Sequence, residues 1–346
     1  MPSALSTRVM IEDIRRVAHA ALTRAGCDHE NAAAVAAVMA ASERDGCVSH
    51  GLFRLAGYLG ALKSGKVNGR ARSAVRRLSP AIVQVDGHGG FAPLAMLKAR
   101  DAIRPVAREQ GIAAAAVVNV HHFSALWIDI EPLIADGLAA MCFTAYIPTV
   151  APYGGREPFF GTNPMAFGWP RPEGRTMIFD QASAAMARGE IMIAARDGYT
   201  LPAGVGIDSA GKPSTDPAAV LQGAQLPFGG YKGSAIALMV ELLSGGLIGQ
   251  PFSVEAGEED NNDGGPPRGG VLLLAMDPGR FGDSHGWLTH SERFFERYAK
   301  LEGVRLPGDR RAKNRERIDR EGTALPADLW QQALAAAGDL REDKRQ

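Results

Sequence analysis

Short apolar segments alternate with longer helical ones along most of this chain, and this alternation constrains its fold more than any other feature. Residues 112–120 and 138–144 are nearly continuous apolar runs of strand length, and residues 125–135 between them have helical length. Further strands are predicted over residues 81–85, 165–169, 177–180 and 271–276. Interleaved strands and helices pack as layers, so the sequence predicts an α/β fold of one large or two ordinary domains.

Helices are predicted at both ends of the chain. Near the amino terminus, residues 9–25 and 28–45 have helical patterns, and Asp28 is a suitable cap for the second helix. A third helix over residues 51–63 would bury its leucines on one face and place Tyr58 on the outer face. Residues 257–270 are acidic and rich in Asn, Gly and Pro, which is typical of a mobile surface loop. Further helices are predicted over residues 93–110, 182–196, 231–248 and 284–301, with a weak final helix in the charged tail.

The composition argues against several classes of function. Lys and Arg together number 38, as do Asp and Glu, so there is no surplus charge for nucleic acid or an anionic membrane surface. Cys27, Cys47 and Cys142 are odd in number and lack metal-ligand spacing, which indicates free thiols and no metal site. No apolar run approaches the length of a membrane span, and the amino terminus lacks the pattern of a signal peptide. We therefore expect a cytoplasmic protein that acts on a small molecule.

A hydroxyl, an imidazole and a guanidinium occur within the six residues 49–54, which read Ser-His-Gly-Leu-Phe-Arg. If the chain is helical from Gly51 onward, His50 and Arg54 lie one turn apart on one face, away from the leucines. That face would place a proton donor beside a cation that binds carboxylates. The alternative is that Ser49 only caps a helix and that the other two are solvated surface residues.

The usual motif for nucleotide binding is missing, but one other segment could hold a phosphate group. Gly87, Gly89 and Gly90 come closest to G-x-G-x-x-G, but Ala92 stands at the last glycine position, so a Rossmann site is not predicted. The segment 121–125, His-His-Phe-Ser-Ala, follows a predicted strand and opens a helix, where free backbone N–H groups can hold phosphate oxygens. The alternative is a capping serine and a histidine packed in the core.

Polar residues that suit a ligand site recur downstream. Thr162 lies in the turn Phe-Gly-Thr-Asn-Pro, and Asp180 ends a predicted strand. Glu190 lies on the predicted helix that follows, and an acid near an imidazole suits general acid–base chemistry. Lys232 stands at a glycine-rich helix start that would suit an anion. Three arginines that could accept a 2′-phosphate, or could be solvated, are Arg305, Arg310 and Arg311.

The order of these motifs resembles the malate/L-lactate/sulfolactate dehydrogenase family, whose members bind NAD(P) without a Rossmann fold. The resemblance rests on Ser-His-Gly-x-x-Arg, His-His-Phe-Ser-Ala-Leu-Trp, Phe-Gly-Thr-Asn-Pro, Asp-x-Ala followed by Ala-Arg-Gly, and Gly-Gly-x-Lys-Gly-Ser, and it spans residues 8–311. Segments 121–127, 167–172 and 221–224 are similar to the branch that reduces the cyclic imine acids Δ1-piperideine-2-carboxylate and Δ1-pyrroline-2-carboxylate. The resemblance therefore implies reduction to L-pipecolate or L-proline, with NADPH or NADH, by a homodimer.

The resemblance also implies an architecture. The cofactor domain would be layered around a mixed, mostly antiparallel sheet, and a helical partner domain would form from the two chain ends. We divide the chain into residues 1–75, helical with the Ser/His/Arg group; 76–115, a strand and helix of the substrate domain; 116–280, the NAD(P)-binding domain; and 281–346, helices that pack back on the amino-terminal part.

A role for each matching residue follows from the same resemblance. His50 would be the proton donor, with Ser49 and Glu190 as its relay. Arg54 would hold the substrate carboxylate, and Thr162 would contact the substrate. The residues that would line the cofactor are His121, His122, Phe123, Ser124, Ala125, Asp180, Gln181, Ala182, Tyr231, Lys232, Arg305, Arg310 and Arg311.

Two positions depart from the pattern of the cyclic imine branch. Glu190 stands where an aspartate is expected, which moves the carboxylate by about one bond length in a site where geometry sets the rate. Tyr231 stands where a histidine is expected, which would affect cofactor preference. A 2-oxo-acid reductase of the malate or lactate type is therefore the alternative enzyme. A non-catalytic relative that binds a nucleotide or an amino acid is the alternative from another class.

Overall fold

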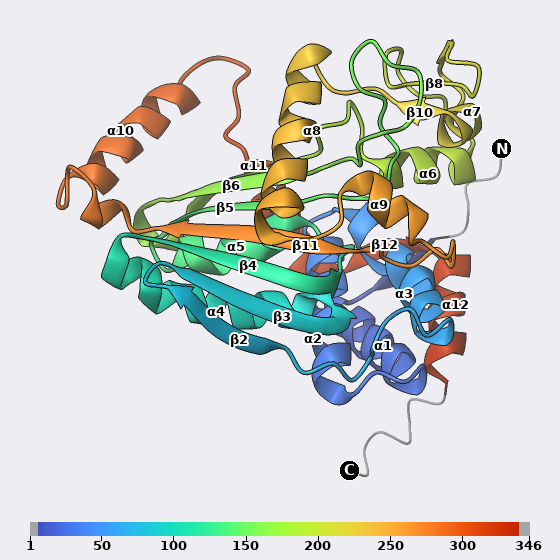
Figure 1. Cartoon of the computed structure of the whole chain (residues 1–346), viewed down its shortest axis with the longest axis horizontal. Helices are drawn as coiled ribbons and strands as arrows, with labels where there is room; N and C mark the ends of the chain where they lie inside the picture. The colour runs from blue at the N-terminus through green and yellow to red at the C-terminus, as the bar shows by residue number, and fades with distance from the viewer. Residues whose placement is uncertain (1–5, 339–346) are drawn as a thin grey trace.

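The computed structural model describes residues 6–338 and is built around a seven-stranded mixed sheet (Figure 1). The strand order is β2-β3-β4-β11-β5-β6-β7, in which β3 and β4 are parallel and the other neighbours are antiparallel. The predicted α/β class and the mostly antiparallel mixed sheet are confirmed. The strands are β2 (Ala74–Ser79), β3 (Ile82–Phe91), β4 (Ile112–His121), β5 (Ala139–Thr144), β6 (Met165–Pro170), β7 (Thr176–Gln181) and β11 (Arg268–Met276).

Both faces of this sheet are covered by helices, which explains why its central strands are apolar at almost every position. On one face, α4 (Ala92–Gln110) and α5 (Leu126–Ala135) share a core with Leu273 of β11. On the other face, α8 (Tyr231–Ser244) packs against Leu272 of the same strand (Figure 1). Adjacent residues of one strand thus belong to different cores, as the twofold alternation of a strand requires.

The two ends of the chain form the helical layer that was predicted. Strand β1 (Ser6–Val9) pairs with β12 (Thr323–Pro326), and α12 (Ala327–Ala337) packs on α1 (Ile11–Arg24). The carboxylate of Asp28 accepts the Asn31 backbone N–H at 3.0 Å and caps α2 (His29–Arg44), as expected from the sequence. Residue 9, predicted to be helical, belongs instead to β1.

The carboxy-terminal segment divides into two parts. Helix α10 (Trp287–Ala299) lies away from the amino-terminal helices, at the far end of the sheet (Figure 1). There the Trp287 ring lies 5.9 Å from the Trp169 ring, and Glu292 pairs with Arg171 at 2.6 Å. Only α11 (Asp309–Glu321) and α12 pack back as expected. The boundary at 115/116 falls inside β4, so segments 76–115 and 116–280 share one sheet. Residues 1–5 and 339–346 of the end segments lie outside the described residues.

Three local expectations were wrong. The helix predicted over 51–63 is a short 3₁₀ helix, Leu52–Arg54, followed by α3 (Leu55–Lys63), and another short 3₁₀ helix, Val48–His50, precedes them. Tyr58, placed on the outer face, is only 2% exposed because its ring packs edge-on against Phe91 at 4.8 Å. The helix predicted from residue 182 begins only at Arg188, as α6 (Arg188–Asp197).

The acidic loop 257–270 is held by α3 rather than exposed along its length. Lys66 pairs with Asp260 at 3.0 Å and with Asp263 at 2.5 Å, and all three side chains are largely buried. A small outer unit lies beside α6 and consists of α7 (Pro217–Gln222), β8 (Gly206–Ile207), β9 (Pro213–Ser214) and β10 (Ala224–Gln225). Helix α9 (Ser253–Glu258) is bonded instead to α8, through the Ser253 backbone N–H and the Glu241 carboxylate.

One stretch, Tyr231–Ile248, is long and apolar enough to cross a membrane by length and composition, contrary to the expectation that no such run exists. In this structure α8 carries a buried Glu241, whose carboxylate accepts hydrogen bonds from Asn163 and from the Ser253 backbone N–H. These bonds, and its packing on the sheet, make α8 a structural element of the fold.

Candidate active site

A cavity of about 520 Å³ opens where the helical layer meets the sheet edge. Its volume lies in the range of small-molecule and cofactor sites. The Ser/His/Arg segment, the start of α5, the end of β7 and the start of α6 converge on it. The lining comes from residues within segments 45–54, 122–127, 144–146, 162–164, 178–190 and 305–311.

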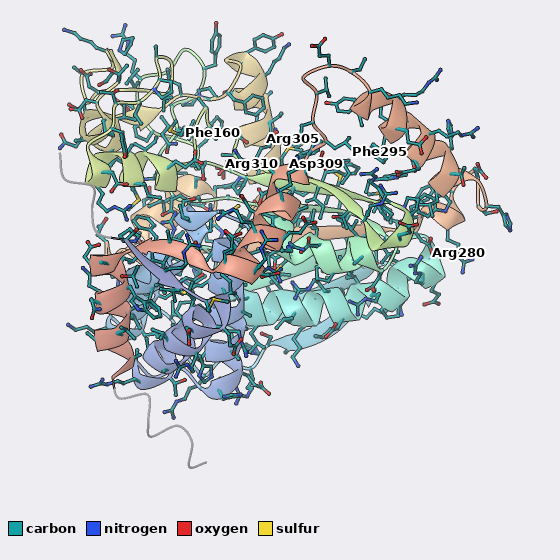
Figure 2. All side chains as sticks on the ribbon, turned by 180° about the vertical axis from the view of Figure 1, so that it is seen from behind. Phe160, Arg280, Phe295, Arg305, Asp309 and Arg310 are labelled. Atoms are coloured by element: carbon teal, nitrogen blue, oxygen red, sulfur yellow. The ribbon has the colours of Figure 1, made fainter. Side chains whose placement is uncertain are left out.

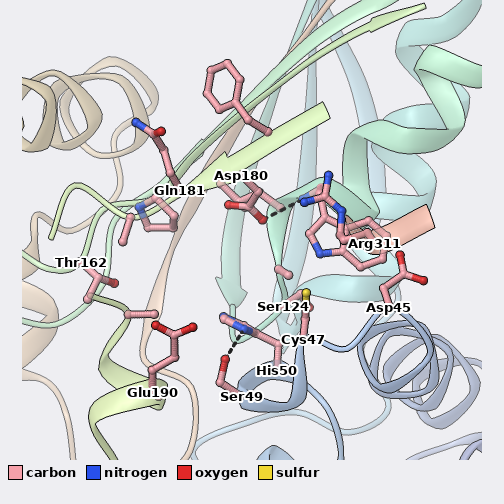
Figure 3. A pocket seen from close by; sticks show the side chains of 18 of the residues that line it. Asp45, Cys47, Ser49, His50, Ser124, Thr162, Asp180, Gln181, Glu190 and Arg311 are labelled. Atoms are coloured by element: carbon pink, nitrogen blue, oxygen red, sulfur yellow. Dashed lines mark hydrogen bonds between the residues drawn. The ribbon is translucent and has the colours of Figure 1, made fainter. Parts of the chain in front are cut away.

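His50 enters the cavity from the first 3₁₀ turn, where Ser49 fixes its ring (Figure 3). The Ser49 Oγ and His50 Nδ1 atoms lie 3.1 Å apart, within hydrogen-bonding distance. The other ring nitrogen, Nε2, has no hydrogen bond to any residue that the structure describes, so it is the atom left for a ligand.

The His50 imidazole is held in its neutral form. Burial, together with the positive charges of Arg54 and His122, lowers its pKa from 6.5 to about 3. A proton donor must hold a proton at working pH, so His50 can serve only if a ligand raises this pKa.

Arg54 lies beside His50 and lacks a counterion. Its Nε donates to the Ser49 carbonyl at 2.8 Å, and its guanidinium lies 4.7 Å from the centre of the Phe123 ring. No carboxylate within residues 6–338 pairs with it, and burial lowers its pKa. A buried guanidinium without an anion is costly, so this end of the cavity is suited to a carboxylate.

Arg188 is a second cation in the same place, and sequence reasoning missed it. It lines the cavity at the start of α6, and burial lowers its pKa, with Arg54 contributing. Among the described residues, its side chain hydrogen-bonds only the Leu221 carbonyl, at 3.4 Å. The sequence signal for Arg188 was the Ala-Arg-Gly motif. No role could be assigned to its arginine until the fold placed it beside Arg54.

Gly189 allows α6 to approach the segment 49–54 closely. A Cβ atom at this position would lie 2.8 Å from Arg54 Nη2 and 2.9 Å from the Ser49 Cβ. Both distances are too short, so any side chain here would displace the two groups that orient the site. Sequence reasoning missed this contact because the two segments meet only in three dimensions.

Glu190 and Thr162 both line the cavity, as expected. Glu190 is exposed and points into the cavity from the wall opposite Ser49 and His50 (Figure 3). It makes no hydrogen bond to His50 among the described residues. The predicted relay through Glu190 therefore remains a prediction.

Several expected cofactor residues gather on the sheet side of the cavity. His122, Phe123, Ser124 and Ala125 line it at the start of α5. The His122 Nε2 atom lies 3.6 Å from a carboxylate oxygen of Asp129. The Trp127 Nε1 atom is buried without a hydrogen-bond partner among residues 6–338. Buried polar atoms are normally satisfied, so this N–H fits a polar ligand such as a dinucleotide.

Asp180, Gln181 and Ala182 line the cavity at the end of β7. The Asp180 carboxylate accepts the Trp127 backbone N–H at 3.0 Å, and burial raises its pKa to about 6. This carboxylate therefore fixes the start of α5, where the cofactor residues sit.

The three arginines of segment 305–311 border the cavity, but they are not equivalent. Arg311 is engaged, since its Nη2 donates to the Ile178 carbonyl at 2.6 Å and its guanidinium lies 5.2 Å from the Trp127 ring. Arg305 and Arg310 lie together at the start of α11 (Figure 2), and neither pairs with a carboxylate in the described part of the chain.

Three expected cofactor residues do not line the cavity of the single chain. His121 precedes His122 at the strand end, so it points the other way, and its Nδ1 lies 3.1 Å from the Pro266 carbonyl. Tyr231 and Lys232 are exposed at the start of α8, outside the cavity lining. The sequence around these residues did not indicate that His121 points away from the cavity or that Tyr231 and Lys232 lie outside it.

Comparisons with known proteins find relatives that match nearly the whole chain. The model of the malate/L-lactate dehydrogenase family matches residues 9–333. A Δ1-pyrroline-2-carboxylate reductase of Ancylobacter novellus is 46% identical over 96% of this chain and 98% of its own length. A crystal structure of Δ1-piperideine-2-carboxylate reductase from Pseudomonas syringae superposes with a TM-score of 0.90 and 39% identity, over 95% of this chain and 99% of that one. A (2R)-3-sulfolactate dehydrogenase (NADP+) of Chromohalobacter salexigens is 39% identical over 90% of this chain and 93% of its own length.

We expect a carboxylate ligand to raise the pKa of His50, because an anion beside Arg54 offsets a positive charge that lowers it. An NMR titration of the imidazole with and without saturating acetate measures the change, with His50→Asn used to assign the signal. Arg54→Met should raise the pKa of the free protein and abolish the response to acetate. An unchanged pKa at saturation would contradict the coupling.

Proposed function

Because the chain belongs to the malate/L-lactate dehydrogenase family, we propose that it reduces the cyclic imine acids Δ1-pyrroline-2-carboxylate and Δ1-piperideine-2-carboxylate with a nicotinamide cofactor. The products would be L-proline and L-pipecolate. The observation that carries the proposal is the buried Arg54 guanidinium, without a counterion, beside the neutral His50. This pair suits a small acid that needs one proton.

In this reaction Arg54 holds the substrate carboxylate, and Arg188 adds a second positive charge. The bound nicotinamide would supply a hydride to C2 of the ring imine. The π electrons of the C=N bond then pass to nitrogen, which takes a proton from His50. Binding the carboxylate raises the pKa of His50, so the donor is charged only when substrate is present. His50 ends the step neutral, and solvent returns its proton.

The remaining site residues support His50 and the substrate. Ser49 holds the Nδ1 side of the ring, which leaves Nε2 toward the substrate. Glu190 supplies a negative charge on the facing wall, which favours the imidazolium form. Thr162 offers a hydroxyl to the substrate.

We infer that NADPH is the preferred cofactor, with NADH possible. Two cations without partners, Arg305 and Arg310, suit a 2′-phosphate, whereas Arg311 is already bonded. The similar sulfolactate dehydrogenase is named as NADP+-dependent. The residues that would hold the dinucleotide are His122, Phe123, Ser124, Ala125, Asp180, Gln181 and Ala182.

The test of the function is a substrate panel with the purified protein. We expect NADPH oxidation with the two imine acids to exceed that with pyruvate and oxaloacetate at equal concentrations. Loss of a general acid costs on the order of 10²–10⁴-fold, so His50→Asn should lower kcat by that amount and leave the Kd for NADPH unchanged.

Preference for pyruvate or oxaloacetate would instead establish the 2-oxo-acid reductase of the malate or lactate type. Cofactor binding without turnover on any imine or oxo acid would establish a non-catalytic binding protein.

The cofactor preference can be tested at Arg310. A charge-assisted hydrogen bond is worth about 1.5–3 kcal/mol, so Arg310→Ser should lower kcat/KM for NADPH by roughly 10- to 100-fold. The value for NADH should change little. Arg317→Ser, an exposed position on the same helix, is the control. Equal losses with both cofactors would contradict a 2′-phosphate contact.

We infer a homodimer formed through α8. Leu238, Leu242 and Leu247, on and just beyond this helix, are 49%, 54% and 66% exposed, and such a grouping is typical of an interface. Tyr231 and Lys232 begin the same helix, so a cofactor role for them rests on this contact. Sedimentation should show a dimer that Leu242→Glu dissociates and Leu301→Glu does not. A monomeric wild type would contradict the inference.

We also infer a cytoplasmic location, which cell fractionation tests. All three cysteines, Cys27, Cys47 and Cys142, are free. Burial raises the pKa of Cys47 to about 11, so this cavity-lining thiol stays protonated and serves no nucleophilic step. The balanced charge of the chain favours a small-molecule ligand over nucleic acid.

A further inference from the structure

A buried carboxyl group, Glu43, lies directly behind the segment that carries His50 and Arg54. It stands in the last turn of α2 and is 1% exposed. Its Oε1 accepts the Leu52 backbone N–H at 2.8 Å. Its Oε2 is buried and has no hydrogen-bond partner within residues 6–338. The chemistry derived above does not use this group, although burying a half-satisfied carboxyl is costly.

Gly51 shows how tightly Glu43 is packed into the turn. A Cβ atom on Gly51 would lie 2.1 Å from Glu43 Oε1 and 2.5 Å from its carboxyl carbon. A side chain at position 51 would overlap the Glu43 carboxyl group, so only glycine fits here. The backbone of Gly51, at φ −87° and ψ −142°, is where the two 3₁₀ helices separate. The Glu43 carboxyl group thus occupies the space beside Gly51, at the break between the two 3₁₀ helices.

The break decides the directions of the functional side chains. His50 precedes it, and its N–H bonds to the Cys47 carbonyl at 2.9 Å. Arg54 follows it, and its N–H bonds to the Gly51 carbonyl at 3.0 Å. Each short helix is held internally, and the Arg54 Nε bond to the Ser49 carbonyl joins the two helices directly. The bond from Leu52 to Glu43 in addition ties the backbone of the second helix to α2, from which the first one emerges.

We propose that Glu43 is a positioning residue, whose carboxyl group holds the step between Gly51 and Leu52 so that His50 and Arg54 face the same cavity. The proposal rests on the proposed function for the roles of these two side chains. An apolar side chain of the same size would leave the Leu52 N–H buried without an acceptor, so the position needs an oxygen. Burial raises the pKa of Glu43 to about 7, and the Leu52 bond opposes that rise. A protonated carboxyl group still accepts the Leu52 N–H through its carbonyl oxygen, so this bond needs an acceptor oxygen and not a negative charge.

Matched variants separate positioning from simple stability. Glu43→Gln keeps the length and an acceptor oxygen, whereas Glu43→Ala removes both. Asp28→Ala is the control, because it removes the cap of the same helix at its other end. Misplacement of catalytic groups by about 1 Å costs about 10²-fold, so we expect Glu43→Ala to lose 10- to 100-fold in kcat with the imine acid. KM for that acid should rise, and KM for NADPH should not.

Glu43→Gln should keep kcat within about threefold of the wild type. Asp28→Ala should lower Tm with kcat unchanged. The proposal is overturned if Glu43→Ala keeps kcat while Tm falls, or if Glu43→Gln loses as much as Glu43→Ala.

A second measurement does not depend on turnover. The response of the His50 imidazole signal to acetate requires His50 and Arg54 to face one cavity. It should persist in Glu43→Gln and in Asp28→Ala and disappear in Glu43→Ala. If the wild type shows this response but reduces no imine acid, the proposed function fails while the positioning role is still tested. An acetate response in Glu43→Ala equal to that of the wild type overturns the positioning role.

Discussion

The Arg315 guanidinium, held between two carboxylates, joins the three parts of this protein that surround the cavity. It bonds Asp45 at 2.6 and 2.9 Å and Glu131 at 3.0 Å, which connects α11 to the end of α2 and to α5. The Asp45 side chain is fully buried, and removing the partner of a buried charge costs about 3–5 kcal/mol. This contact sets the place of the segment 305–311 over the cavity. The cations proposed for the cofactor depend on it.

The electrostatics of the cavity follow from what the fold leaves unpaired. Arg54 and Arg188 share one end without a carboxylate from the described chain, and they face a histidine that burial keeps neutral. The cavity therefore favours an anion, and without one it keeps His50 neutral. In the proposed function the substrate carboxylate supplies the missing negative charge, so recognition of the acid and preparation of the proton donor are the same event.

Most of the residues chosen from the sequence line the cavity, because the chemistry is carried by short local motifs. Ser49, His50 and Arg54 fall within six residues, and any compact turn keeps them together. The same reasoning misplaced His121, because adjacent residues at a strand end point in opposite directions. It also assigned one continuous helix to residues 51–63. A helical pattern cannot show that Gly51 is pressed against Glu43, eight positions earlier.

The sequence by itself determined the class of fold, the burial of the central strands and the inventory of reactive groups, because these depend on local pattern and composition. Only the tertiary structure decided which groups meet. Arg188 faces Arg54 because Gly189 lets α6 approach to contact distance, and Glu43 supports His50 because a glycine leaves room for its carboxyl group. Such contacts join residues that lie far apart along the chain or on different elements. Close packing sets their distances, and no linear pattern records them.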